Sequence, residues 1–485
     1  MRRRLIPIAL MLLGSATVSA QEPSVKEVAL HPAAEPDPAL RYAFWPAPET
    51  RIEANAAPFA SRSIILLMEN APSAEERQTY ADKYNQWREM PIDELPVAEV
   101  KQYLDRHARA ALAELERAEP LMRIDYDLRL TELSVAEMVG TLLPEIQSMR
   151  EVARMIELRA RVAVAEKRWD DFAHDMRIGF RLSDMAGSSN DLLISRLVGF
   201  AISSLMMSVV QDAIQQPDCP NFYWALAAIP DGLFEIRDAI EFESILLTKL
   251  TSGFPELPST AIGAVRAREL IRRLADEALS LGFAPADAAA RDLVIGMAVV
   301  SLAEPSRELL DDTSVWSGRA HELSAPEAVL RATVLKLQRS RHQWLKWTLM
   351  PDDRWEQYAQ RAEADLLATP KAADDLFVIL ANQLVPAVTA AKRAAQRTQQ
   401  QRNLLITMES LRMHASQADE LPASLKDVEP VPAWSDPLAG AAFEYQRQSP
   451  TSATIQGAPR YPGDEQSFQI SLNVQSQPSN TEKSQ

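Results

Sequence analysis

Two carboxylates and an imidazole stand close together at Asp170, Asp171 and His174. Side chains four residues apart share one face of a helix, so one carboxylate and the imidazole could form half of a metal site. A di-iron helix bundle adds a second Glu-x-x-His pair, and the sequence contains none. We therefore interpret this trio as a solvated helix face.

The other reactive side chains fall into no catalytic or metal-binding motif. None of the six histidines forms HExxH, and we expect a structural or surface role for His342. Cys219 has no histidine nearby in the sequence, so we expect a buried thiol, or one beside a helix cap, and not a nucleophile. The absence of GxSxG, GxGxxG and GxxxxGK[ST] argues against a nucleophile elbow and against nucleotide-binding loops.

Three tryptophans, Trp344, Trp347 and Trp355, stand near Lys346 and Arg354. They could form a cation–π or ligand-binding patch, but tryptophans three residues apart more often pack between helices, and we favour that interpretation. The sequence thus predicts no catalytic, cofactor-binding or metal-ligating residue, and no cofactor.

Helical periodicity runs almost without interruption from about residue 61 to 416. We expect Pro144 in the first turn of a helix and Pro386 to kink or split another. Ser324 and Glu327 have the spacing of a capping box. Residues 158–173 resemble one tetratricopeptide unit, but no 34-residue period follows, so we expect an ordinary antiparallel helix pair. The expected helices cover 73–89, 97–117, 144–167, 169–185, 190–215, 233–250, 259–281, 285–303, 325–347, 351–368 and 374–416.

After Glu420 the composition changes to a proline-rich sequence with short alternating stretches. Apolar and polar residues alternate over 441–447, 452–456 and 467–474, which predicts two or three antiparallel strands. The polar residues 475–485 are expected to form a disordered tail.

The segment 401–474 resembles the C-terminal half of type II secretion pseudopilins, an element that also ends large uncharacterised secreted bacterial proteins. The resemblance rests on a helix containing residues 406–412, then Leu-Pro-Ala-Ser-Leu at 421–425, then Asp-Pro-Leu-Ala-Gly at 436–440 followed by Phe443 and Tyr445. The Asp-Pro-Gly turn is rigid, and both aromatic rings can pack back on the helix. Some pseudopilins bind calcium near this turn, but Asp436 has no clustered acids or asparagines here, so we do not expect a site.

The first twenty residues are typical of a secretory signal. Three arginines at 2–4 precede the apolar stretch 5–13, and Val-Ser-Ala at 18–20 predicts cleavage after Ala20. Loss of the three arginines would change the formal net charge from −16 to −19. The best later candidate for a membrane span is 197–210, which contains no charged residue. It is too short to span a membrane and predicts a buried helix. We therefore expect a periplasmic or secreted protein.

Composition sets the remaining limits. With 67 acidic against 51 basic residues and one cysteine, the chain is a poor candidate for nucleic-acid binding and cannot form an internal disulfide. We predict a mainly α fold, an irregular multi-helix array or bundle with a small antiparallel β module at the C-terminus. The expected divisions are a signal peptide at 1–20, an extended or partly disordered leader at 21–60, a helical domain at 61–373 and a helix-plus-β module at 374–474.

These patterns favour a helical scaffold or interaction protein that binds protein partners at the cell envelope and has no evident catalytic chemistry. One alternative is an envelope-acting enzyme whose site is assembled from dispersed residues. The other is a hydrophobic-ligand binding protein, suggested by the apolar, Met-rich stretch around Leu205, Met206 and Met207.

Overall fold

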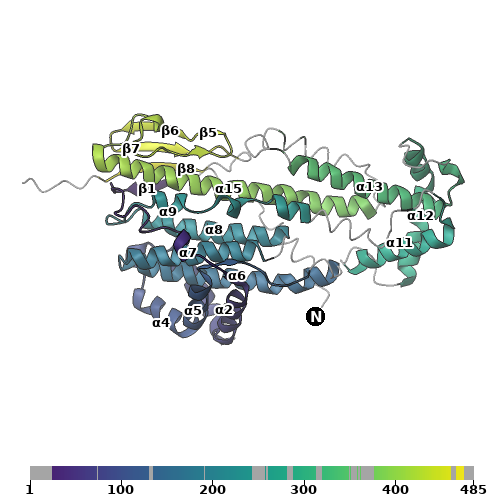
Figure 1. Cartoon of the computed structure of the whole chain (residues 1–485), viewed down its shortest axis with the longest axis horizontal. Coiled ribbons are helices and arrows are strands. Elements are labelled where there is room, and N and C mark those ends of the chain that lie inside the picture. The colour runs from purple at the N-terminus through teal and green to yellow at the C-terminus, as the bar shows by residue number, and fades with distance from the viewer. Residues whose placement is uncertain are drawn as a thin grey trace, which may run out of the picture.

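The computed structural model describes residues 25–73, 75–129, 135–189, 192–242, 257, 260–280, 288–312, 319–348, 350, 358, 361, 376–459 and 466–473. Long helices run along one axis, and a small sheet lies over one end of them (Figure 1). The predicted mainly α fold with a small β module is confirmed. The signal peptide at 1–20, the helix at 351–368 apart from residues 358 and 361, and the tail at 475–485 lie outside the described residues.

The described α-helices form an elongated body (Figure 1). They are α2 (Ala57–Glu69), α3 (Glu76–Glu89), α4 (Val97–His107), α5 (Arg109–Ala118), α6 (Val135–Ala165), α7 (Trp169–Gly187), α8 (Leu193–Ala213), α9 (Tyr223–Ala227), α11 (Gly263–Ser280), α12 (Ala288–Asp312), α13 (Ala325–Thr348) and α15 (Leu376–Ala418). Short 3-10 turns connect them: η1 (Pro48–Thr50), η2 (Ile92–Glu94), η3 (Asp231–Phe234), η4 (Ala320–Glu322) and η5 (Leu425–Asp427).

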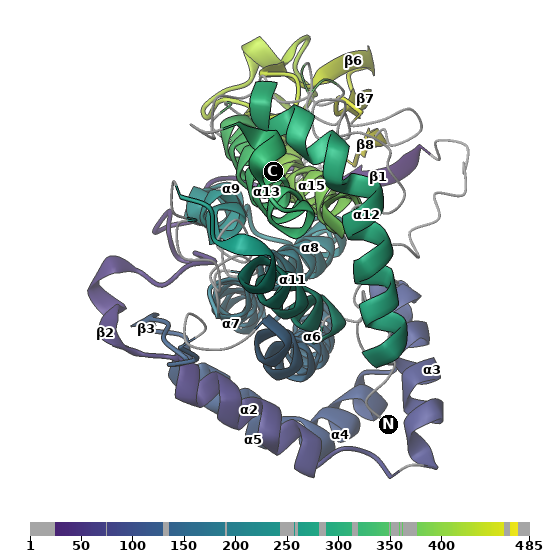
Figure 2. The same cartoon turned by 90° about the vertical axis from the view of Figure 1, so that its right-hand side faces the viewer.

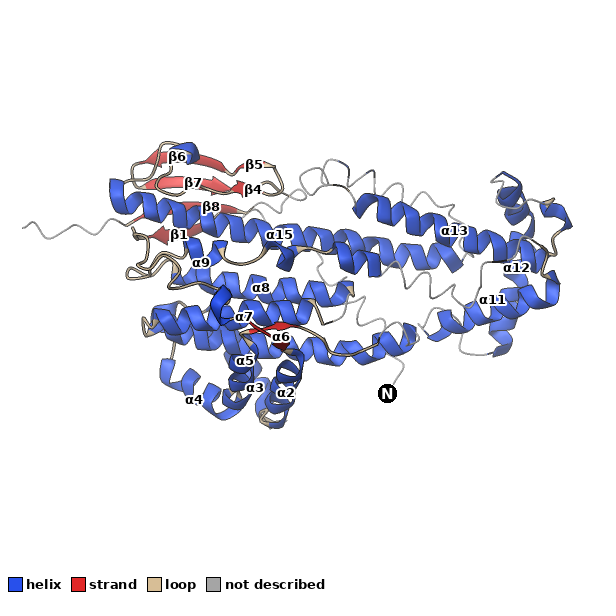
Figure 3. Ribbon diagram, viewed as in Figure 1, coloured by secondary structure: helices blue, strands red, loops and turns tan. Residues whose placement is uncertain are grey.

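The strands gather mainly beside the C-terminal part of α15 (Figure 3). The main sheet has the order β1-β8-β7-β6, formed by β1 (Lys26–Leu30), β8 (Ser467–Leu472), β7 (Ser452–Gln456) and β6 (Glu444–Ser449). Two small ladders complete the set: β2 (Ile52–Asn55) with β3 (Leu121–Arg123), and β4 (Ser435–Asp436) with β5 (Ala441–Ala442). The antiparallel pairing of β6, β7 and β8 matches the expected strands.

The first strand is a difference from the sequence-based expectation. β1 lies in the proline-rich leader and pairs in parallel with β8, with Lys26 opposite Phe468 and Leu30 opposite Leu472. Val28 and Leu30 are buried in the main hydrophobic core. The described part of the leader is therefore ordered and belongs to the sheet, because its apolar residues are covered by a strand more than 400 residues away in the sequence.

The helices form layers around α8. α6 and α7 pack on one side of α8, α15 packs on another, and α2, α4 and α5 cover α6 from outside (Figure 2). One large core runs through these layers and continues under the β module, where Ile406, Phe443 and Ile470 belong to it. The expected pairing of 158–167 with 169–173 is the start of the α6–α7 pair.

Three helix boundaries differ from the sequence-based expectation. The predicted helix 97–117 breaks at Ala108, because α4 packs on α6 whereas α5 packs on α2. α6 begins at Val135, so Pro144 lies inside it and not in its first turn. α15 continues without interruption across Pro386, so the helix is not split there.

The capping box at Ser324 and Glu327 is also wrong. The Glu327 carboxylate accepts hydrogen bonds from the backbone N–H groups of Ile262 and Gly263, each 2.9 Å long, and forms an ion pair with Arg331. It therefore caps the start of the neighbouring helix α11. The Ser324 hydroxyl has no hydrogen-bond partner in the described structure. The local pattern assigns this carboxylate to its own helix, but in the folded chain it binds the start of another helix.

A buried ion pair links α15 to two distant segments. Glu409 and Arg412 have fully buried side chains, and their closest atoms are 2.8 Å apart. The Arg412 guanidinium also donates to the carbonyl oxygens of His31, Cys219 and Pro220. These carbonyls belong to the segment after β1 and to the α8–α9 connection, so one side chain joins three parts of the chain.

We expect Arg412→Met to lower the free energy of unfolding by about 3–5 kcal/mol, because it leaves the Glu409 charge and three carbonyl oxygens without partners in a dry site. Urea unfolding monitored by circular dichroism measures this change. The double variant Glu409→Gln/Arg412→Met should lose less than the single variant, because no unpaired charge remains.

A matched control is Arg154→Met. Arg154 and Glu151 form an ion pair with the same residue types and spacing, but their side chains are 41% and 55% exposed. Loss of this pair should cost about 1 kcal/mol or less. An equal effect of the two arginine substitutions would contradict the role assigned to Arg412.

Candidate functional site

The structure separates the trio of Asp170, Asp171 and His174. Asp170 lies at the surface and forms a bidentate pair with Arg41, at 2.8 and 3.1 Å. Asp171 is exposed and pairs with Arg168. His174 is half-buried and lines, with Asp171, a cleft of about 330 Å³ between α4, α5, α6 and α7. In this cleft, Asp171 and His174 lie near other titratable groups.

The centre of this cleft is a buried carboxylate that the sequence did not single out. Asp175 is 3% exposed and lies 2.7 Å from the Arg159 guanidinium, which is also 2.7 Å from Glu116. Burial raises the pKa of Asp175 to about 6, although Arg159 acts in the opposite direction. Burial also lowers the pKa of His174, and the charges of Arg177 and Arg159 add to that effect.

Several charges of the cleft are held in pairs. The same pattern continues at its edge, where Glu166 accepts from Lys101 at 2.9 Å and from Arg168 at 2.9 Å. Among the described residues that line the cleft there is no serine, threonine, cysteine or tyrosine. The arrangement supplies a stable ion-pair network around a weakly acidic carboxylate, and its groups are engaged with one another.

Metal binding finds no support in the part of the chain that the structure describes, where no three His, Cys, Asp or Glu side chains cluster as ligands. His107 lies inside the fold and contacts the Asn70 carbonyl oxygen at 2.6 Å through Nδ1. His342 is exposed on α13. The side chains of Trp344 and Trp347, together with Trp355, lie outside the described residues, so the aromatic patch remains a prediction.

Cys219 is buried, as predicted. Its backbone carbonyl accepts from Arg412 at 2.6 Å, and its thiol lies 3.4 Å from the Pro220 carbonyl oxygen. Burial strongly raises the pKa of the thiol. A thiol in this setting is held as a structural group and not as a thiolate nucleophile.

The turn at Asp436 is built from the chain's own donors. The Asp436 carboxylate accepts from the Gln400 side-chain amide and from the backbone N–H groups of Leu438 and Ala458, at 2.7–3.2 Å. Gly440 follows with φ of +61° and closes the turn by donating to the Asp436 carbonyl. A side chain at Gly457 would collide with Gln400. The resemblance of this module to pseudopilins remains a prediction.

The Met-rich stretch is part of the core. Met206 and Met207 are fully buried on α8, and Met206 lies against the space left by Gly179 of α7. By length and composition α8 alone among the described helices is apolar enough to cross a membrane, and 61% of its most apolar window is buried in the fold. Its packing against α7 and α15 accounts for this apolar character.

The N-terminal half of α12 carries four of the large apolar side chains that are exposed among the described residues. Leu293, Val294, Met297 and Val300 are 63%, 46%, 57% and 80% exposed. Residues 293, 297 and 300 follow helical spacing, so three of them form a stripe on one face. The sequence signal for this stripe was present, because residues 293–303 contain no charged side chain. We call these four residues the α12 stripe.

Comparison of the chain with family models, curated proteins and solved structures finds no match.

Asp175 provides a test by pH. An acid whose pKa is raised on folding binds its proton more tightly in the folded state, so the stability it contributes is lost as the pH rises from about 4 to about 6. As the pH rises through this window, we expect the free energy of unfolding of Asp175→Asn to increase by roughly 2–3 kcal/mol relative to that of the parent protein. Urea unfolding at several pH values measures this difference.

Asp170→Asn is the control for that experiment. The hydrogen bonds from Arg41 lower the pKa of Asp170. The stability that Asp170 contributes is therefore lost as the pH falls. Between the same two pH values, the free energy of unfolding of Asp170→Asn should change slightly relative to the parent, with a sign opposite to that of Asp175→Asn. Parallel behaviour of the two variants would contradict the charge state assigned to Asp175.

Cys219 offers a second test. We expect the folded protein to react with a thiol reagent such as DTNB ~100-fold more slowly than the urea-unfolded protein, because both burial and the raised pKa suppress thiolate formation. A Cys219→Ser variant gives the blank for the absorbance signal. Equal rates in the two states would show that the thiol is accessible.

Proposed function

We propose that this chain is a helical scaffold or interaction protein of the cell envelope that binds a protein partner through the α12 stripe. The exposure of these four apolar side chains carries the proposal. Single exposed apolar residues are ordinary, but a contiguous group of them on a helix is typical of a binding surface. Full burial of each such side chain contributes about 1.5–3 kcal/mol.

The rest of the molecule supports a binding role over a catalytic one. In the cleft, Arg159 is paired with Glu116 and Asp175, Asp436 is saturated by donors of the chain, and Cys219 is buried. The α12 stripe, in contrast, lies on a helix whose other half is anchored: Ser306 and Leu310 are buried there. A firmly held helix therefore presents an apolar face to its surroundings.

Charge indicates the chemistry of the partner. The chain carries a formal net charge of −16, so a second copy would be repelled from a contact of only a few turns of helix. Acidic residues Asp292 and Glu304 stand at the two ends of the stripe. Both acids form ion pairs within the chain, Asp292 with Arg272 and Glu304 with Arg307. The apolar stripe between them fits an apolar helix face of a different protein.

The envelope location rests on the signal sequence predicted for residues 1–20. A periplasmic or secreted scaffold would meet its partner after export, and the partner is expected among envelope proteins. Fractionation of cells that express the full chain measures the location directly. A protein that stays in the cytoplasmic fraction with residues 1–20 uncleaved would contradict this part of the proposal.

Site-specific photocrosslinking in cells tests the α12 stripe. A benzoyl-phenylalanine side chain is placed at position 293 or 300, or at Leu40, an apolar residue that is 61% exposed far from α12 in the sequence. We expect one protein adduct, identical at 293 and 300, absent at 40, and lost when Met297→Glu is added.

Three results would contradict the proposal: the same adduct at position 40, adducts only with a second copy of this chain, or adducts only with lipid. Reconstitution with the identified protein then distinguishes the stripe from a nearby surface. The affinity for the partner should fall at least about tenfold in Met297→Glu and stay unchanged in Leu40→Glu.

A further inference from the structure

Sulfur atoms are exposed at two places in the described part of the chain. Met68 on α2 is 64% exposed and Met297 on α12 is 57% exposed. The other methionines whose side chains the structure describes are buried or half-buried, and Met206 is among the most deeply buried. Cys219, the single cysteine, is buried as well. An oxidant in solution therefore reaches the thioethers of Met68 and Met297 first.

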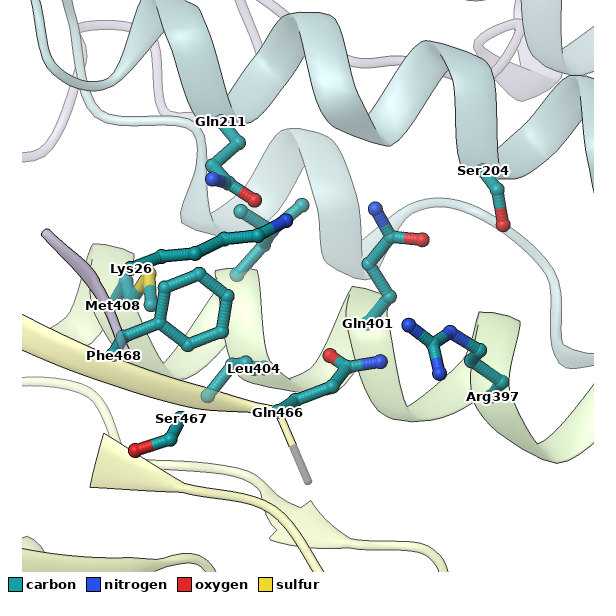
Figure 4. A pocket seen from close by; sticks show the side chains of 11 residues that line it. Lys26, Ser204, Gln211, Arg397, Gln401, Leu404, Met408, Gln466, Ser467 and Phe468 are labelled. Atoms are coloured by element: carbon teal, nitrogen blue, oxygen red, sulfur yellow. The ribbon is translucent and has the colours of Figure 1, made fainter. Parts of the chain in front are cut away.

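Met408 shows how closely the fold covers its other thioethers. A cavity of about 270 Å³ lies between α8, α15 and the main sheet where β1 meets β8, and Lys26, Arg397 and Met408 line it (Figure 4). The Met408 side chain lies beside the Phe468 ring in this view (Figure 4). Even beside a cavity, Met408 is only 1% exposed. Access to solvent therefore separates Met297 clearly from the methionines of the core.

Met297 is the central member of the α12 stripe. Residues three and four positions apart are neighbours on a helix, so Met297 adjoins Leu293, Val294 and Val300. The surface beside the stripe is open, because no heavy atom lies within 4 Å of the point where a side chain at Gly296 would begin. A chemical change at the Met297 sulfur therefore alters the middle of the stripe and leaves the core untouched.

A peroxide supplies the chemistry of such a change. A lone pair of the thioether sulfur attacks one peroxide oxygen, the O–O bond breaks and an S–O bond forms. The proton on the transferred oxygen passes to the departing hydroxide, which leaves as water. Two thiols of a sulfoxide reductase reverse the step, because they remove the oxygen as water and become a disulfide.

The product suits the α12 stripe poorly as a binding surface. A thioether is apolar and flexible, and it packs well against another apolar side chain. A sulfoxide is polar, and its oxygen loses its hydrogen bonds to water when an apolar partner covers it. One oxygen atom at Met297 therefore weakens binding of an apolar helix face.

We propose that Met297 is a site of reversible oxidation by peroxides, and that its sulfoxide releases the partner held by the α12 stripe. The release rests on the binding role proposed for this stripe. Met68 is equally accessible but lies on α2, outside the stripe, so its oxidation leaves the partner bound.

The rates of oxidation test the site without any partner. The folded protein is treated with hydrogen peroxide, and peptide mass spectrometry follows each methionine. We expect Met297 and Met68 to be oxidised at rates within about threefold of one another, and Met206 at least about tenfold more slowly. The three rates should converge in urea, because burial no longer protects Met206. A rate at Met297 as slow as that at Met206 in the folded protein would overturn the proposal.

Photocrosslinking tests the release. Purified protein with benzoyl-phenylalanine at position 300 is treated with peroxide, freed of it with catalase and irradiated with an envelope fraction. We expect the yield of the partner adduct to fall at least about tenfold in the parent and in Met68→Leu. Met297→Leu keeps an apolar side chain of similar volume without an oxidisable sulfur, so its adduct should persist. Methionine sulfoxide reductase should restore the adduct of the parent.

The possible outcomes distinguish the two proposals. A full adduct from the oxidised parent, or a lost adduct from oxidised Met297→Leu, would overturn the release. No adduct from any untreated protein would overturn the binding role of the stripe and the release with it, whereas the oxidation rates would still decide whether Met297 is the reactive site. Near-ultraviolet circular dichroism before and after peroxide establishes that the protein remains folded.

Discussion

The buried ion pair of Glu409 and Arg412 is the interaction on which the arrangement of this chain most depends. Two charges inside a protein are tolerated only when each is fully paired. Arg412 meets this requirement by binding Glu409 and three backbone carbonyls from two distant segments. The same contacts therefore position the segment after β1, the α8–α9 connection and Cys219 around α15, and they account for the order of a proline-rich N-terminal segment.

The same helix uses other polar residues to hold η3 and the β module. The Arg402 guanidinium lies 4.9 Å from the Phe234 ring and 5.3 Å from the Trp434 ring, and it is 2.7 Å from Asp231. The Asn403 side chain donates to the Ser435 carbonyl at 2.9 Å. Several of the buried polar side chains of α15 thus join this helix to its surroundings. The α12 stripe, in contrast, leaves apolar side chains exposed.

The sequence predicted the helical body well because amphipathic periodicity is a local property. It also located β6, β7 and β8 from alternation alone. The sequence-based prediction failed where residues could make contacts either within their own segment or with a distant one. Glu327 has the spacing to cap its own helix, yet it binds the first backbone amides of α11. Apolar residues recur at helical spacing over the whole of 97–117. The helix nevertheless breaks at Ala108, and α4 packs on α6 whereas α5 packs on α2. Neither outcome is visible in a single segment.

The sequence by itself determined the mainly α class, the strand positions near the C-terminus and the absence of familiar catalytic motifs. Each of these depends on residues close together in the chain. Only the tertiary structure decided that β1 joins the sheet, that Asp175 is buried beside Arg159, and that Lys26 and Arg397 face one cavity. Those features bring together residues between 16 and more than 400 positions apart. Burial and pairing depend on such contacts, and so the candidate sites emerge only after the chain has folded.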